Sequence, residues 1–120
     1  MNKCKITLLF LLFTCIFISC NQLAENNILQ EISSPDNCYK AIVFSRTAGA
    51  TTAFNIQISI IEQNKKLPNK PGNIFISDYV DNLEVYWLTE KELQISVPIS
   101  EIRIYKNEAE IKGIKIVYDF

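Results

Sequence analysis

The chain has 120 residues, with 12 basic and 13 acidic side chains and no histidine. This length fits a single domain, and the balanced charge offers no basic surface of the kind that binds nucleic acid. The absence of histidine excludes catalysis by a serine or cysteine that relies on a histidine base, and every metal site with imidazole ligands. We therefore expect no nucleic-acid partner, no metal and no cofactor.

The N-terminal segment has the parts of a secretory signal peptide. Lys3 and Lys5 supply positive charge, and a predominantly apolar run of 13 residues follows at positions 6–18. Such a run fits the length of signal peptides and is shorter than the roughly 20 residues that span a bilayer. The sequence therefore predicts export of the protein.

The end of this leader resembles the lipobox of bacterial lipoproteins, in which Leu, a small residue, and Gly or Ala precede a modified cysteine. Ser19 and Cys20 fit the pattern, Ile18 is compatible, and Phe17 stands where Leu is usual. The resemblance implies that a signal peptide, residues 1–19, is removed and that Cys20 carries acyl chains such as palmitate. Several acyl chains anchor a protein stably to a membrane. We expect a lipid-anchored protein of the bacterial cell envelope, at the outer membrane or the outer face of the cytoplasmic membrane.

Two alternatives for the leader stay open. One is ordinary secretion, with cleavage nearby and no role for Cys20, although no Ala-x-Ala site is present. The other is an uncleaved N-terminal anchor, for which the apolar run is short.

The cysteines divide between the leader and the body. Cys4 and Cys15 lie within the leader, Cys20 ends it, and Cys38 is the only thiol in the remaining chain. No disulfide is therefore possible within the body. We expect Cys38 to be a small buried apolar residue, and the alternative is pairing with a second chain.

The mature chain divides into a tether and one domain. Residues 20–34 are polar with scattered Leu and Ile, which suits a short tether or one helical turn at residues 23–29. Residues 35–120 form the predicted domain, in which apolar and polar residues mostly alternate as in half-buried strands. The alternating or continuous apolar segments are residues 41–44, 56–60, 83–87, 93–97, 102–104 and 114–116.

Turn residues separate these segments. Pro35 and Asp36 precede the first, a loop with two prolines covers residues 64–73, and Lys112-Gly113 forms a tight turn before the last. This pattern predicts an all-β fold, an antiparallel meander of six or seven short strands arranged as a sandwich, a small barrel or one twisted sheet. The run at 41–44 is apolar on both faces, which indicates a central strand.

The loop between the first two predicted strands is the candidate binding site. It contains Arg46, Gly49, Thr51 and Thr52 among small residues. Gly49 allows positive φ, and adjacent N–H groups beside Arg46 suit a carboxylate or phosphate. The alternative is a plain hairpin loop whose threonines bind their own backbone. Either threonine would need an adjacent base to act as a nucleophile, so we expect no catalytic residue.

Residues over most of the body, from Ser34-Pro35-Asp36 to Trp87-Leu88, are similar to those of a group of small uncharacterised bacterial lipoproteins. In that group a cysteine often precedes the glycine, whereas this chain has Ala48, so any role of that cysteine does not transfer. The resemblance implies the fold and the leader, and it brings no activity. The shared features include Ser34-Pro35-Asp36, Gly49-Ala50-Thr51-Thr52 and Trp87-Leu88.

Two further groups of side chains have the composition of a site. Asp78, Asp81 and Glu84 place three carboxylates around one turn, and calcium binds such oxygens, but a solvated acidic turn is the better interpretation. The aromatic residues suit a sugar-binding strip, but cross-strand packing of Tyr86 with Tyr105 is the plainer expectation.

These observations leave three hypotheses for function. The first is a non-catalytic envelope lipoprotein that binds a protein or cell-wall partner. The second is an inhibitor or immunity-type lipoprotein that blocks an enzyme or toxin. The third is a small hydrolase, which requires a Lys or carboxylate within reach of Arg46 and the threonines.

Overall fold

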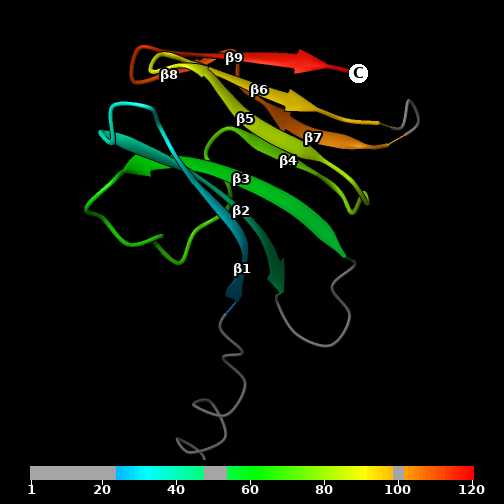
Figure 1. Ribbon diagram of the computed structural model, residues 1–120. Helices are drawn as coiled ribbons and strands as arrows, with labels where there is room; N and C mark the ends of the chain where they lie inside the picture. Colours follow the sequence, from blue (N-terminus) through cyan, green and yellow to red (C-terminus); the bar gives the residue numbers. More distant parts are fainter. Residues whose placement is uncertain (1–23, 48–53, 99–101) are drawn as a thin grey trace, which may run out of the picture.

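The structure is a computed structural model that describes residues 24–47, 54–98 and 102–120. These residues form nine strands and no helix, so the expected all-β fold is confirmed (Figure 1). No helix within the described ranges is long and apolar enough to cross a membrane. The strands are β1 (Glu25–Ser33), β2 (Tyr39–Thr47), β3 (Asn55–Glu62), β4 (Phe75–Asp78), β5 (Glu84–Thr89), β6 (Glu92–Ser96), β7 (Ile104–Asn107), β8 (Glu110–Ile111) and β9 (Ile114–Asp119).

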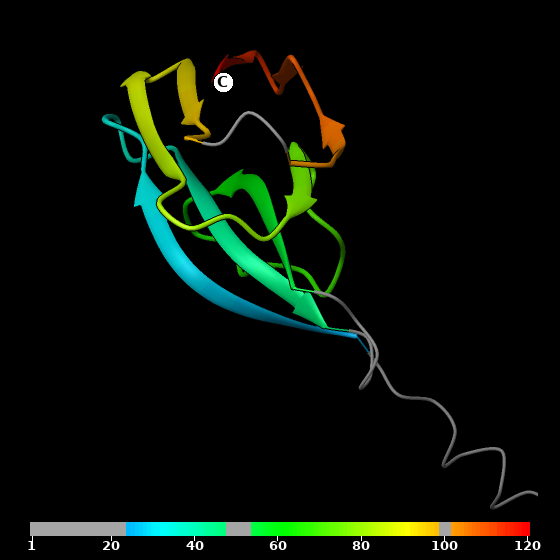
Figure 2. The ribbon, with the colours of Figure 1, turned by 90° about the vertical axis from the view of Figure 1, so that its right-hand side faces the viewer.

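The strands are divided between two sheets. The five-stranded sheet has the order β1-β2-β3-β4-β7, and its first four strands form the expected antiparallel meander. The four-stranded sheet has the order β5-β6-β9-β8, and here β6 and β9 are parallel, with Leu93 opposite Ile116. Figure 2 shows that β1 and β2 extend well beyond the four-stranded sheet at one end.

The main core lies between the two sheets. Strands β2 and β3 occupy the centre of the larger sheet, and residues 41–44 are all buried, as predicted for a central strand. Because alternate residues of a strand point to opposite faces, Ala41 and Val43 join the main core while Ile42 and Phe44 face the other side. From the smaller sheet, Leu93 contributes to the same core.

The outer face of β2 and β3 is covered by the loop at residues 63–74. Leu67 from this loop packs on a small apolar cluster on that face. The proline-containing loop is therefore a packed layer of the domain. The members of the cluster are Ile42, Phe44 and Ile61.

Polar residues of β3 hold this loop in place. The alternation of β3 predicts that Gln57 and Ser59 face water, and this is wrong, since both are buried beneath the loop. Gln57 Oε1 accepts a hydrogen bond from Gly72 N–H at 2.7 Å, and Ser59 Oγ accepts one from Asn73 N–H at 3.0 Å. These bonds offset the removal of the two polar side chains from water.

Two asparagine side chains continue the strand pairing. The Asn73 amide donates to Ile60 O at 2.8 Å and accepts from Ile60 N–H at 2.9 Å, as a neighbouring strand would. The Asn55 amide likewise donates to Arg46 O at 2.7 Å and accepts from Arg46 N–H at 2.9 Å. Each amide thus satisfies a backbone N–H and a C=O that the strands themselves leave unpaired.

The tether predicted at residues 20–34 is wrong from Glu25 onward. Strand β1 forms part of the larger sheet and pairs with β2 from Glu25, opposite Thr47, to Ser33, opposite Lys40. A bulge falls at Leu29, where the register shifts. The folded domain therefore begins before residue 35, with an edge strand.

The turn that follows β1 corrects the expectation for Cys38, which is exposed instead of buried. The Asp36 carboxylate accepts hydrogen bonds from Ser34 Oγ at 2.7 Å and Cys38 N–H at 3.1 Å, which closes an Asx turn. Asn37 adopts a φ of 58° within this turn. The hydrogen bond from Ser34 is the main reason that the pKa of Asp36 lies below its usual value.

The two sheets meet at their edges. Trp87 Nε1–H of β5 donates to Ile32 O of β1 at 2.9 Å, and the Trp87 ring packs on the main core. At the other side, the chain passes from β7 directly to β8 and so changes sheets. The expected packing of Tyr86 on Tyr105 is wrong, because the two residues lie on strands of different sheets.

Candidate functional site

Arg46 of the predicted binding loop lies at the end of β2 and joins three segments. Its Nη1 donates to Asn26 Oδ1 of β1 at 2.7 Å and to Asn69 Oδ1 of the 63–74 loop at 2.9 Å. Asn26 Nδ2 in turn donates to Pro68 O at 3.0 Å and Lys70 O at 3.2 Å. Both Nη1 protons are thus used to fasten the loop to the edge of the sheet.

The other donors of Arg46 have no partner among the described residues. The guanidinium has five N–H groups, and neither Nε nor Nη2 donates to another described residue. No carboxylate of the described ranges forms an ion pair with Arg46. Gly49, Thr51 and Thr52 lie outside the described residues, so the anion-binding loop stays a prediction.

Sequence reasoning missed the partners of Arg46. Asn26 and Asn69 lie 20 and 23 positions away in the chain, and no local motif indicates either contact. The contacts follow from the pairing of β1 with β2, in which Asn26 stands opposite Arg46.

An apolar cleft of about 400 Å³ opens on the opposite face of the same sheet end. Phe54 and Tyr79 meet edge to face in it, with ring centroids 5.9 Å apart, and Tyr79 N–H donates to Phe54 O at 3.2 Å. A hydrogen bond to the Asp81 carboxylate is the main cause that raises the pKa of Tyr79. The cleft is lined by Asn27, Leu29, Ser45, Phe54 and Tyr79.

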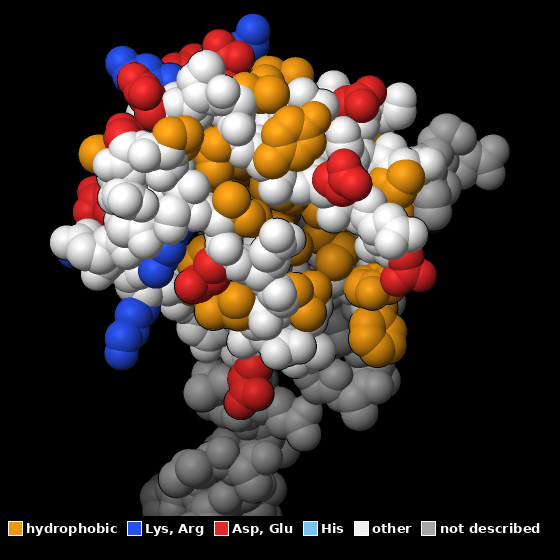
Figure 3. Space-filling model, in the orientation of Figure 1, with side chains coloured by type: hydrophobic (Ala, Val, Ile, Leu, Met, Phe, Trp, Pro, Cys, Tyr) orange, Lys and Arg blue, Asp and Glu red, His pale blue; other side chains and the backbone are white. Residues whose placement is uncertain are grey.

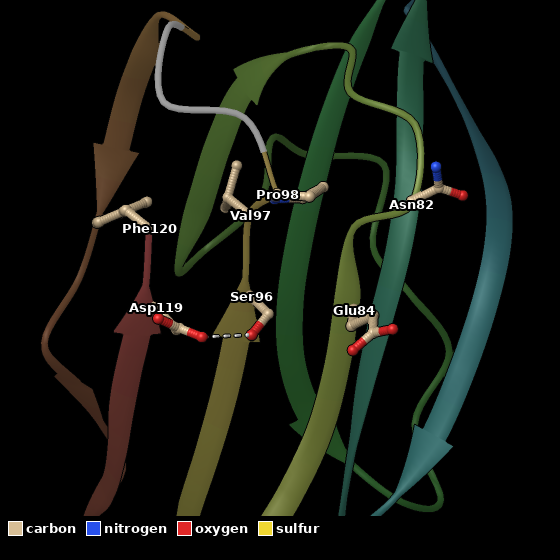
Figure 4. Close-up of a pocket in the computed structure, with 7 residues that line it drawn as sticks. All are labelled: Asn82, Glu84, Ser96, Val97, Pro98, Asp119 and Phe120. Carbon is tan, nitrogen blue, oxygen red and sulfur yellow. Dashed lines mark hydrogen bonds between the residues drawn. The ribbon is translucent and has the colours of Figure 1, made fainter.

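A second hollow, of about 420 Å³, lies at one end of the four-stranded sheet (Figure 4). Three of its lining residues lie side by side on neighbouring strands: Glu84 on β5, Ser96 on β6 and Asp119 on β9. Ser96 Oγ donates a hydrogen bond to Asp119 Oδ2 at 3.2 Å. Among the described residues neither carboxylate forms an ion pair, so the hollow suits a cationic group. The rest of the lining is Asn82, Val97, Pro98 and Phe120.

The three carboxylates around the acidic turn have separate surroundings. Asp78 accepts a hydrogen bond from the Tyr105 hydroxyl at 2.9 Å, Asp81 interacts with Tyr79, and Glu84 lines the hollow of Figure 4. In the described part of the chain no three potential ligands of a metal ion gather.

Comparison with known proteins gives a family and no function. A family model matches residues 2–110, and it is described as DUF5412, a family of unknown function. The chain belongs to the DUF5412 family. The match covers most of this DUF5412 protein and ends before β9. No curated protein and no solved structure matches the chain.

Proposed function

We propose that this DUF5412 protein is a lipoprotein of the bacterial cell envelope, anchored through lipid on Cys20, and that its β domain is a non-catalytic binding module. The observation that carries the proposal is the leader that ends in Ser19-Cys20, followed five positions later by the first strand, at Glu25. An exported chain with this arrangement places a folded domain directly beside its anchor.

The short spacing limits where a partner can be. Five residue steps span at most about 18 Å in any conformation, at roughly 3.3–3.6 Å a residue. Because β1 is part of the sheet, the start of the domain is held within that distance of the anchor, and a partner must approach the domain close to the membrane. A resident envelope protein or a cell-wall polymer meets this condition.

The surroundings of the reactive groups support a binding role. Cys38 is the one thiol of the described residues, and the adjacent Asp36 carboxylate raises its pKa, so the weakly nucleophilic thiol form dominates at neutral pH. Arg46 Nη1 donates to Asn26 and Asn69, and these hydrogen bonds position the 63–74 loop against β1.

Incorporation of radiolabelled palmitate in a native host tests the anchor. We expect label in the wild type, loss of label in Cys20→Ala, and full label in the matched control Cys15→Ala, whose cysteine lies within the leader. Unlabelled wild-type protein in the culture medium would contradict the proposal and favour a free secreted protein.

The hollow of Figure 4 supports a second candidate, an inhibitor or immunity-type lipoprotein. Its two carboxylates, Glu84 and Asp119, form no ion pair with another described residue and suit a basic group on an enzyme or toxin. Chemical crosslinking in intact cells, followed by purification from membranes, tests both candidates. A soluble enzyme or toxin that is crosslinked to the wild type and lost in Glu84→Gln/Asp119→Asn favours inhibition, whereas a resident envelope component favours the first candidate.

A further inference from the structure

Three of the large apolar side chains exposed to solvent lie together around the apolar cleft. Exposed apolar area of this kind is unfavourable in water, and a contiguous group marks a contact surface more often than a scattered one does. We call this group the apolar patch. Its members are Leu29, Phe54 and Tyr79, whose exposed fractions are 51%, 80% and 47%.

The apolar patch lies at the end of the sheet where the N-terminal segment joins the domain. Strand β1 begins at Glu25, opposite Thr47, the last residue of β2. Phe54 immediately precedes β3, whose first residue, Asn55, is bound to the backbone of β2, and Phe54 O accepts from Tyr79 N–H. The start of β1 and the apolar patch are therefore at the same end of the larger sheet, which projects beyond the smaller one (Figure 2).

The opposite end of the domain is charged. The β5–β6 hairpin lies there, beside the turn at Cys38, where the Glu90 charge contributes to the raised pKa of the thiol. In Figure 3, Lys, Arg, Asp and Glu side chains gather at upper left over β8 and the neighbouring hairpin, whereas the lower right, beside the start of β3, shows hydrophobic side chains with Asp or Glu next to them and no Lys or Arg. Strand β1, nine residues long, separates the two ends by about 26 Å, at roughly 3.3 Å for each residue step.

We infer that the apolar patch docks on the lipid bilayer to which the protein is anchored. The inference rests on the proposed lipid anchor at Cys20. An anchor five positions before β1 places this end of the sheet nearest to the membrane. Tyr79 suits the interface, where its ring meets lipid and its hydroxyl meets water, and the wholly apolar side chains of Leu29 and Phe54 suit the lipid itself.

Docking would fix the orientation of the domain. With the apolar patch on the bilayer, the larger sheet stands away from the membrane, and the charged β5–β6 hairpin lies at the end farthest from it. A domain swinging freely on a short lipid tether would present every face in turn.

Quenching of tryptophan fluorescence by lipids brominated in their acyl chains tests the inference. The full lipidated protein is reconstituted into phosphatidylcholine vesicles with and without brominated lipid. Phe54→Trp places a reporter in the apolar patch, and Leu88→Trp places a matched reporter at an exposed apolar position of β5 near the charged end. The natural Trp87 is retained, because it bonds to β1, and its emission is subtracted.

We expect brominated lipid to remove most of the added emission of Phe54→Trp and to leave that of Leu88→Trp unchanged. Circular dichroism verifies that both variants fold. Emission of Phe54→Trp that resists quenching, in protein that floats with the vesicles, would overturn bilayer docking and leave the anchor standing. Equal quenching of both reporters would also overturn bilayer docking, because it would show that the domain has no fixed orientation on the membrane. Wild-type protein that does not float with vesicles would instead contradict the anchor.

Discussion

Replacing Asn73 by alanine removes the side chain that extends the sheet at Ile60. Its amide makes two hydrogen bonds to the Ile60 backbone, at 2.8 and 2.9 Å. Ile60 is completely buried, so water cannot readily replace these bonds. The substitution also releases the loop that carries Asn69 to Arg46, and thus connects stability to the candidate site.

The size of the effect follows from the two unsatisfied groups. A buried N–H or C=O left without a partner costs about 1–3 kcal/mol, so we expect Asn73→Ala to lower the free energy of unfolding by about 2–4 kcal/mol. That is a large part of the roughly 5–15 kcal/mol that stabilises a typical domain. For a domain of this size each kcal/mol shifts the melting temperature by about 4–8 °C.

Thermal unfolding of the purified full-length protein, followed by circular dichroism, measures this effect. The matched control is Asn64→Ala, because Asn64 is exposed in the same loop and makes no side-chain hydrogen bond to another described residue. We expect the control to melt with the wild type and Asn73→Ala to melt at least about 8 °C lower, at about 4–8 °C per kcal/mol. Equal melting temperatures for all three proteins would refute the reasoning.

Three further predictions concern the loop, the sheet edges and the first turn. Gly72→Ala places a Cβ 2.8–3.0 Å from the backbone of β3 and β4, so we expect a loss of stability of several kcal/mol, about as large as overpacking produces, measured by urea denaturation. Trp87→Phe keeps the ring in the core but removes the bond to Ile32 O, and we expect about 1–2 kcal/mol lower stability and faster amide exchange in β1. The lowered pKa of Asp36 means that its ionised form stabilises the fold above the ordinary value of 3.8, and that this contribution disappears as pH falls through the lower, folded-state value. Wild type should therefore exceed Asp36→Asn in urea stability at neutral pH and match it in strong acid, and a constant difference would contradict the role of the Ser34 hydrogen bond.

The strands with a regular apolar pattern could be predicted from the sequence. Ile56, Ile58 and Ile60 recur at every second position because they line the core face of β3. The turn at Lys112-Gly113 was also predictable, since both residues adopt the positive φ that such a turn requires.

Features that depend on distant contacts could not be predicted in this way. In β1 only Asn26 and Ile32 are even half-buried, so an edge strand leaves no periodic signal. The exposed polar face assigned to β3 was wrong because the covering loop comes from residues 63–74, after the strand. Strand β6 pairs in parallel with β9, which lies about 20 residues later in the chain. The alternation of apolar and polar residues within a strand does not determine which distant strand it pairs with.

The candidate site also has one part that the sequence predicted and one part that depends on distant contacts. Arg46 stood out as a fixed charge at a strand end, and it is indeed placed where a loop and an edge strand meet. The hollow of Figure 4 joins Glu84 to Ser96 and Asp119 through sheet pairing alone, so no motif in the sequence indicated it.

The central claim is that the mature protein begins at a lipid-modified Cys20. Mass spectrometry of the intact protein, extracted from membranes of a native host, tests it most directly. We expect the mass of residues 20–120 plus a diacylglyceryl group and an amide-linked acyl chain, or the diacylglyceryl group alone. An unmodified mass, or a chain that begins at any other residue, would contradict the claim.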